Sequence, residues 1–323
     1  MRPFAYSRPA TLDEALALLG PSARPLAGGT DLVTLMKADL AAPERLIAVG
    51  KLLPRGVKNG PDGLTLGAAT TLADIERHAS VSRRYTALAQ AAGAAATTQL
   101  RNVATLGGNL LQRPRCWYFR NPLAHCWLKG GAECHARDGE NRQHGVLGGS
   151  ACVAAHPSDV APALVAFDAS VRVRSARGER LLSLEEEFFT LPTDDWRGET
   201  TLRDDDLVLA VSMPPQPGET RSIYLKAMDR QAFSFALAGV AAVVRLSPRR
   251  RIGHARVVLG GLAPIPWRAH SAERVLLGAE VSERVLQDAS DAALEDAVPL
   301  KGNAFKVPLA KALVRRALQA LVE

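Results

Sequence analysis

All four cysteines of this 323-residue chain lie in one segment, at positions 116, 126, 134 and 152. Thiolates are soft ligands, and four of them in one segment suit a zinc ion or an iron–sulfur cluster. Their spacing, C-x9-C-x7-C-x17-C, lacks the C-x2–4-C knuckle of common zinc sites, the C-x2-C run of ferredoxins and the C-x-x-C-H haem motif. Two disulfides also fit the spacing but are disfavoured in a chain without an export signal. The residues leave zinc and an iron–sulfur cluster as open alternatives.

Histidines and large aromatic residues share this segment. The histidines are His125, His135 and His144, and the aromatics are Trp117, Tyr118 and Trp127. One histidine could replace a cysteine as a ligand, as in Rieske centres, but four thiolates make this unnecessary. We interpret the three aromatics as a hydrophobic jacket that limits water access to a bound metal group.

Two glycine pairs lie outside the cysteine segment. "AGGTD" (Ala27–Asp31) stands between an expected strand and a helix, and "TLGGN" (Thr105–Asn109) is expected as a second Gly-Gly turn. Paired glycines let backbone N–H groups approach a ligand and adopt positive φ, which suits a pyrophosphate. Taken singly, each pair could merely turn the chain. No G-x-G-x-x-G or Walker lysine motif occurs, which disfavours a Rossmann domain and a P-loop.

Hydrolytic chemistry has no support in the sequence. His156, in "HPSD", is interpreted as a turn histidine that caps the following helix. No Ser-His-Asp set and no pair of carboxylates with catalytic spacing stands out.

The elements that must position these residues follow from capping and periodicity. "TLDE" at Thr11 is a capping box for a helix that ends at Gly20. Strands are expected at residues 24–27, 45–50, 63–68 and 206–215, a hairpin at 170–184, and a meander of strands at 221–262. Helices are expected at residues 32–40, 70–79, 85–96, from about 158, and at 272–280, 282–297 and 308–323. Strands followed by helices indicate a separate C-terminal α+β unit after the double proline at 214–215.

Composition bounds the class of protein. Hydrophobic residues make up 47% and charged residues 23% of the chain, as in soluble globular proteins. No apolar run approaches the roughly 20 residues of a membrane helix, and no secretory segment begins the chain. The net charge of +7 is spread out, and its densest cluster, Arg249–Arg251, reads as a solvated turn. We therefore expect no nucleic-acid partner and no membrane span; an acidic partner subunit would suit the charge.

Three segments together carry a family resemblance. "PLAGGTDLVTLMK", "LRNVATLGGNLLQ" and "HPSDVAPAL" resemble the flavin-binding medium subunit of the xanthine dehydrogenase and molybdenum hydroxylase family, over essentially the whole chain. The resemblance implies an α+β protein. A two-part FAD-binding domain of the vanillyl-alcohol-oxidase (PCMH) type would span residues 1–216, with subdomains at about 1–55 and 56–216. A C-terminal α+β domain would span 217–323.

The resemblance also implies which residues bind FAD. They are Pro25, Leu26, Ala27, Gly28, Gly29, Thr30, Asp31, Leu32, Thr105, Leu106, Gly107, Gly108, Asn109, Asp159, Val208 and Lys226. The chain departs from the family near Ala95, where an aromatic flavin contact is replaced by a small side chain.

A stretch of about 40 residues, at about 113–153, separates the second glycine pair from the aspartate segment. This cysteine insertion looks like that of the flavin subunit of bacterial periplasmic aldehyde oxidoreductases. The resemblance implies a [4Fe–4S] cluster bound by Cys116, Cys126, Cys134 and Cys152.

The function implied is that of an electron-transfer flavoprotein subunit, with no catalytic residue of its own. A large molybdenum-cofactor subunit would oxidise the substrate, an aldehyde, and a small subunit with two [2Fe–2S] clusters would pass electrons to FAD and on to an external acceptor. Compartment stays open between the cytoplasm and the periplasm, which a folded subunit can reach with a signal-bearing partner. The alternative is a zinc-stabilised module that binds nucleic acid or protein and has no redox role.

Overall fold

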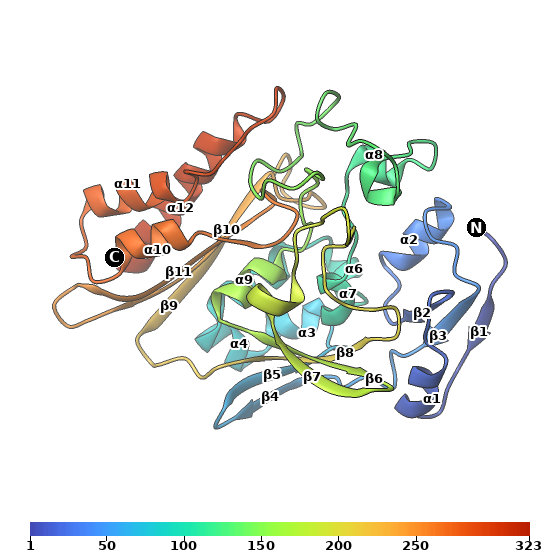
Figure 1. Ribbon diagram of the computed structural model, residues 1–323. Helices are drawn as coiled ribbons and strands as arrows, with labels where there is room; N and C mark the ends of the chain where they lie inside the picture. Colours follow the sequence, from blue (N-terminus) through green and yellow to red (C-terminus); the bar gives the residue numbers. More distant parts are fainter.

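The computed structural model describes all 323 residues and contains three separate β-sheets (Figure 1). The sheets follow one another along the chain, and the two termini lie at opposite ends of the molecule in this view. Helices accompany each sheet, which confirms the expected α+β class.

The first sheet is parallel, with strand order β1-β3-β2. Its elements are β1 (Ala5–Ser7), α1 (Leu12–Ala17), β2 (Ala23–Leu26), α2 (Leu32–Lys37) and β3 (Arg45–Ala48). The Thr11 hydroxyl accepts a hydrogen bond from Glu14 N, so α1 begins where the capping box predicts. It ends at Leu18, before the expected Gly20. Strand β1 was not expected, since three half-exposed residues carry no periodic signal.

The second sheet has the order β4-β5-β8-β6-β7, and its neighbouring strands are antiparallel. Its strands are β4 (Val57–Gly60), β5 (Gly63–Gly67), β6 (Ser170–Ser175), β7 (Gly178–Ser183) and β8 (Leu207–Met213). The helices here are α3 (Leu72–Arg77), α4 (Ala79–Arg84), α5 (Thr86–Ala94), α6 (Thr98–Arg101), α7 (Leu106–Leu110) and α9 (Val160–Ala166), with a π-helical turn at Leu184–Phe188. The expected hairpin turn at Arg177–Gly178 is present, and Gly178 takes a φ of 122°.

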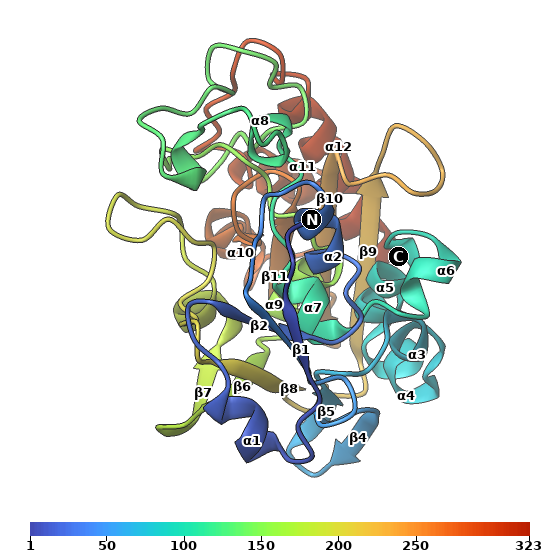
Figure 2. The ribbon, with the colours of Figure 1, turned by 90° about the vertical axis from the view of Figure 1, so that its right-hand side faces the viewer.

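The third sheet is antiparallel, with the order β12-β11-β10-β9. It comprises β9 (Thr220–Ala227), β10 (Ala238–Leu246), β11 (Ile252–Gly260) and β12 (Trp267–Arg268), followed by α10 (His270–Leu276), α11 (Glu283–Ala292) and α12 (Lys306–Val322). These three helices cover one face of the sheet, whereas α5 and α9 pack on the other (Figures 1 and 2).

Strand β10 explains why the apolar run "AGVAAVV" is continuous. Val240, Ala242 and Val244 belong to the core beneath the C-terminal helices. Ala241 and Val243 belong to the core shared with α5 and α9. Because alternate residues of a strand face opposite sides, a strand buried on both faces needs apolar residues at every position.

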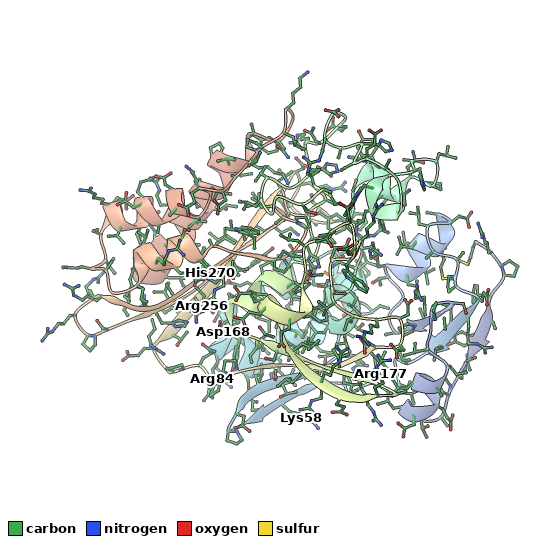
Figure 3. All side chains as sticks on the ribbon, in the orientation of Figure 1. Lys58, Arg84, Asp168, Arg177, Arg256 and His270 are labelled. Atoms are coloured by element: carbon green, nitrogen blue, oxygen red, sulfur yellow. The ribbon has the colours of Figure 1, made fainter.

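Ion pairs join the second and third sheets. Asp168, which follows α9, accepts a hydrogen bond at 3.0 Å from Arg256 on β11, and the two lie together in Figure 3. Arg268 on β12 pairs with Glu185 of the π-helical turn at 2.5 Å and with Glu273 of α10 at 2.9 Å. No helix has the combination of length and apolar content that crossing a bilayer requires.

The cysteine insertion is mostly loop, with one turn of α-helix, α8 (Trp117–Arg120), and one 3-10 turn at Trp127–Lys129. It has its own small core, in which Phe119, Trp127 and Leu128 pack with Leu35 of α2. The insertion is therefore seated directly on the helix that follows the first glycine pair.

Candidate functional site

The first glycine pair lies where β2 passes into α2. Gly29 has a φ of 69°, in the left-handed region that favours glycine, and its carbonyl accepts a hydrogen bond from Val33 N. A Cβ atom on Gly28 would lie 2.2 Å from the carbonyl oxygen of Val103, just ahead of the second glycine pair. Gly28 is therefore needed because it lets the two glycine segments touch each other.

The second glycine pair forms the first turn of α7, which corrects the expectation of a plain turn. Thr105 caps this helix, and its hydroxyl accepts a hydrogen bond from Gly108 N at 3.3 Å. Gly107 packs against Ala68, but a Cβ on Gly108 would meet only the Thr105 hydroxyl within 4 Å. The open side of Gly108 is backbone that a ligand can approach closely.

Asp159 lies beside the second glycine pair and is fully buried. The neighbouring Ser158 hydroxyl donates a hydrogen bond to the Asn109 side chain at 2.5 Å. The Asp159 carboxylate accepts hydrogen bonds from Tyr224 Oη at 2.7 Å and from Lys226 Nζ at 2.9 Å. Burial raises the pKa of Asp159, while the Lys226 ammonium works in the opposite direction. Thus the third sheet supplies Lys226 to a site otherwise built by the first two sheets.

Tyr224 is a site residue that sequence reasoning missed. Burial raises the pKa of the Tyr224 phenol well above its usual value, and the Asp159 carboxylate, which the hydroxyl contacts, raises the pKa further. Tyr224 and Lys226 are two positions apart on β9, so they share one face of the strand. The position of Tyr224 two residues before Lys226 in a predicted strand was the signal in the sequence that could have identified it.

The remaining residues that were predicted to contact FAD lie in several different elements. Pro25 and Leu26 are on β2 and Leu32 begins α2, whereas Leu106 and Val208 are buried in the main core. Ala95 is also buried there, directly after α5. Direct contact of these residues with FAD stays a prediction.

Asp31 faces the cysteine insertion. One carboxylate oxygen accepts a hydrogen bond from Arg113 N at 2.9 Å. The other lies 2.7 Å from Arg115 Nη1 and 2.9 Å from Arg120 Nη2. Both oxygens are therefore engaged by the insertion, and a contact of Asp31 with FAD stays a prediction. Arg115 Nε and Arg120 Nη1 are buried without a hydrogen-bond partner, so donors for an anion remain beside the first glycine pair.

The four cysteines surround one small pocket inside the insertion. All are free thiols; Cys126 and Cys152 are buried, and Cys116 and Cys134 are half-buried. The disulfides that the spacing permitted are therefore not formed. A hydrogen bond from the Cys152 thiol lowers the pKa of Cys134 to about 5, while burial raises the pKa of Cys116 to about 11. The structure contains no group of three or more Cys, His, Asp or Glu side chains arranged to hold a metal ion.

Aromatic side chains line this pocket, but one of the three that were predicted to do so does not. Tyr118, Phe119 and Trp127 line it, but Trp117 is 60% exposed and does not belong to the jacket. Trp117 begins the short helix α8, whose one turn directs Phe119 inward and leaves Trp117 on the outside.

The three histidines of the insertion have different surroundings. His125 is exposed, and His135 lines the pocket but lies 3.4 Å from the Glu133 carboxylate. His144 is buried, and its Nε2 lies 3.1 Å from Cys116 Sγ. Burial and the Lys306 ammonium lower the pKa of His144 to about 4, so its ring is neutral near pH 7.

His156 is buried and makes no catalytic pairing. Its Nδ1 accepts a hydrogen bond from Ser158 N at 3.4 Å, and its ring packs edge-on against Phe189. This agrees with the interpretation as a turn histidine before α9.

Two protein families match successive parts of the chain. Residues 2–216 match the FAD binding domain in molybdopterin dehydrogenase, and residues 223–321 match the CO dehydrogenase flavoprotein C-terminal domain. The chain therefore belongs to the FAD-binding medium subunits of the xanthine dehydrogenase and molybdenum hydroxylase family, which confirms the resemblance.

Individual relatives agree with this assignment. The chain is 39% identical to the aldehyde oxidoreductase FAD-binding subunit PaoB of Escherichia coli K12, over 96% of both chains. It is 27% identical to the xanthine dehydrogenase FAD-binding subunit of Escherichia coli O157:H7, over 98% of this chain and 96% of that one. A solved structure of carbon monoxide dehydrogenase from Hydrogenophaga pseudoflava superposes with a TM-score of 0.79 at 28% identity, covering 99% and 97% of the two chains. By their names, these relatives are subunits or parts of oxidoreductases.

Proposed function

We propose that this chain is the FAD- and [4Fe–4S]-carrying subunit of a molybdenum-dependent aldehyde oxidoreductase. The observation that carries the proposal is the contact between two sites: the glycine pair at β2–α2 and the four-thiol pocket are joined through Asp31 and Leu35. The 39% identity to an aldehyde oxidoreductase subunit supports the substrate class. A large molybdenum-cofactor subunit, a small [2Fe–2S] subunit and an external electron acceptor complete the proposed system.

The residues present fit FAD. Gly28 lets the two glycine segments touch, and a Cβ at Gly108 would meet only the Thr105 hydroxyl within 4 Å, so the rest of that side is open to a ligand. Arg115 and Arg120 keep unpaired buried N–H groups nearby, as a pyrophosphate requires. When bound, FAD accepts electrons from an iron–sulfur partner and releases them to an external acceptor. The two glycine segments would hold the diphosphate of FAD. Asp159 and Lys226 would border the flavin site on the side of the third sheet.

The residues also fit a [4Fe–4S] cluster. Four free thiols line one pocket whose other walls are mostly apolar, which suits a thiolate-ligated cluster shielded from water. A zinc ion held by the four thiolates is the alternative. The resemblance of the insertion to that of aldehyde oxidoreductase flavin subunits, together with the 39% identity to one such subunit, favours the cluster. Backbone N–H groups of residues 118, 119, 136, 153 and 154 direct hydrogen bonds to these sulfurs and would stabilise thiolates.

The test is purification of the full chain, anaerobically, with the subunits that accompany it. FAD gives absorption bands near ~370 and ~450 nm, and a cluster adds broad absorption around ~400 nm that dithionite bleaches. Iron and inorganic sulfide should each approach about eight per complex, of which the two [2Fe–2S] clusters of the small subunit account for about four and the [4Fe–4S] cluster of this chain for about four. One zinc per complex, with no more iron and sulfide than the two [2Fe–2S] clusters of the small subunit contain, would refute the [4Fe–4S] cluster.

A substitution of Cys126 tests whether this residue is a ligand of the cluster. Cys126→Ser should lose about four iron and four sulfide per complex while FAD stays bound, because Cys126 lines the pocket and neither glycine pair does. Leu123→Ser, at a 91% exposed position of the same insertion, is the matched control and should keep both groups. Unchanged iron in the Cys126 variant would exclude it as a ligand.

A further inference from the structure

His144 is fixed against one of the four cysteines. Its side chain is buried, and Nε2 lies 3.1 Å from Cys116 Sγ. The other ring nitrogen, Nδ1, is buried, and Asn141 O lies near the ring but forms no well-aligned hydrogen bond with Nδ1. The contact with sulfur is therefore the one well-formed polar contact of the ring.

The segment before α12, in the C-terminal domain, holds this histidine in place. His144 N donates to Asn141 O at 2.9 Å, and Asn141 Oδ1 in turn accepts from Gly302 N at 2.8 Å. The buried Asn303 amide donates to His144 O at 3.3 Å and to Gly145 O at 3.1 Å. The segment just before α12 thus fixes the backbone on both sides of the ring, so the contact with Cys116 is built into the fold.

The surroundings of the ring decide which nitrogen carries its proton. A proton on Nδ1 would bury a donor without a well-aligned acceptor, because Asn141 O is near the ring but outside hydrogen-bond geometry, and such a donor costs up to about 1–3 kcal/mol. A proton on Nε2 is directed at sulfur and leaves only an unpaired acceptor on Nδ1. Because orphaned buried N–H groups are rarer than under-used acceptors, the Nε2–H form is favoured.

We propose that His144 is a positioning residue for the [4Fe–4S] cluster, where its Nε2–H donates to the Cys116 thiolate and raises the reduction potential of the cluster. This inference rests on the proposed function. Hydrogen bonds to ligating sulfurs withdraw electron density and stabilise the more negative, reduced state of a cluster. Nothing requires His144 to ligate iron, because four thiols already line the pocket.

The experiment compares two substitutions of His144 with one of His135. His144→Leu removes the donor, and His144→Gln keeps an N–H of similar reach. His135→Leu is the matched control, because His135 lines the same pocket but lies beside Glu133 and is one-third exposed. Each full-length variant is purified anaerobically with its accompanying subunits, its iron is counted, and the cluster is titrated by low-temperature electron paramagnetic resonance.

We expect His144→Leu to keep its iron and to shift the cluster to a lower potential. His144→Gln should lie between His144→Leu and wild type, and His135→Leu at the wild-type value, with the flavin potential unchanged in all three. If His144→Leu loses iron, retention of iron by His144→Gln would still support the donor role.

Two results would overturn the inference. A wild-type potential in His144→Leu would show that the hydrogen bond has no effect, and loss of iron from both His144 variants would make the ring a ligand or a purely structural residue. A wild-type complex with only the iron and sulfide of the [2Fe–2S] subunit would instead refute the proposed function itself, so the two failures are distinguishable.

Discussion

Lys226 Nζ lies 2.9 Å from the Asp159 carboxylate, and both side chains are almost completely buried, at 2% and 6% exposure. The two residues are 67 positions apart: Asp159 directly precedes helix α9, and Lys226 lies on strand β9 of the third sheet. Lys226 also donates to Ala94 O at 3.0 Å, so one ammonium joins α5, α9 and β9. This ion pair closes the candidate flavin site from the side of the C-terminal domain.

The first prediction concerns this pair. Lys226→Met leaves a buried carboxylate without its counter-ion, so we expect a loss of about 3–5 kcal/mol in the free energy of unfolding. The double variant with Asp159→Asn should lose at least about 1 kcal/mol less than the sum of the two single losses. Urea unfolding of the flavin-free chain measures both. Lys58→Met, at an exposed lysine on β4 (Figure 3), is the control and should change little. Additive losses would show that the pair is not coupled.

The second prediction distinguishes the roles of the two glycine pairs. Gly28→Ala should destabilise the chain by about 1–3 kcal/mol, because its Cβ would overlap the Val103 carbonyl. Gly108→Leu should leave the flavin-free chain nearly as stable as wild type, since its Cβ meets open space beyond the Thr105 hydroxyl. Its flavin content should nevertheless fall sharply. Thermal unfolding and released-flavin absorbance test both, and full flavin occupancy in Gly108→Leu would contradict the placement of the diphosphate.

The third prediction concerns the seating of the cysteine insertion. Asp31→Asn removes the charge shared by Arg115 and Arg120, both mostly buried, and should cost about 1–3 kcal/mol. Proteolysis within residues 113–153 should become faster than in wild type. Asp205→Asn breaks the more exposed pair with Arg177 and is the control, with an expected loss under about 1 kcal/mol. Equal cleavage rates in the two variants would show that Asp31 does not seat the insertion.

The fourth prediction is a pH dependence. Burial lowers the pKa of His156 to about 4 from an unfolded value of 6.5. The folded state disfavours the protonated ring, so the stability due to the neutral ring is present above pH 6.5 and is lost as pH falls toward 4. That loss is about 3 kcal/mol for this one group.

Urea unfolding at pH 7 and at pH 4 checks the size of this effect. His156→Gln should lose about 3 kcal/mol less than wild type on acidification, whereas His125→Gln, at an exposed histidine, should follow wild type. Identical acid losses in wild type and His156→Gln would mean that His156 does not titrate with a lowered pKa.

The sequence predicted the parts of this protein that depend on local patterns. Periodicity placed most helices and strands, and Thr11 correctly marked the start of α1. It missed β1 and β4, which are short and largely exposed, and it described Gly107 and Gly108 as a turn when they begin α7. Short-range signals cannot tell a capped helical turn from a loop turn when both use Thr and Gly.

The family and the concentration of cysteines were therefore already determined by the order of residues along the chain. The pairings that shape the site were not: Lys226 with Asp159, Arg120 with Asp31, and His144 with Cys116 join residues 67, 89 and 28 positions apart. No local pattern encodes such partners, because they meet only when three sheets and an insertion pack together. Tertiary structure decided them, since burial makes each of these polar groups depend on the partner that the fold places beside it.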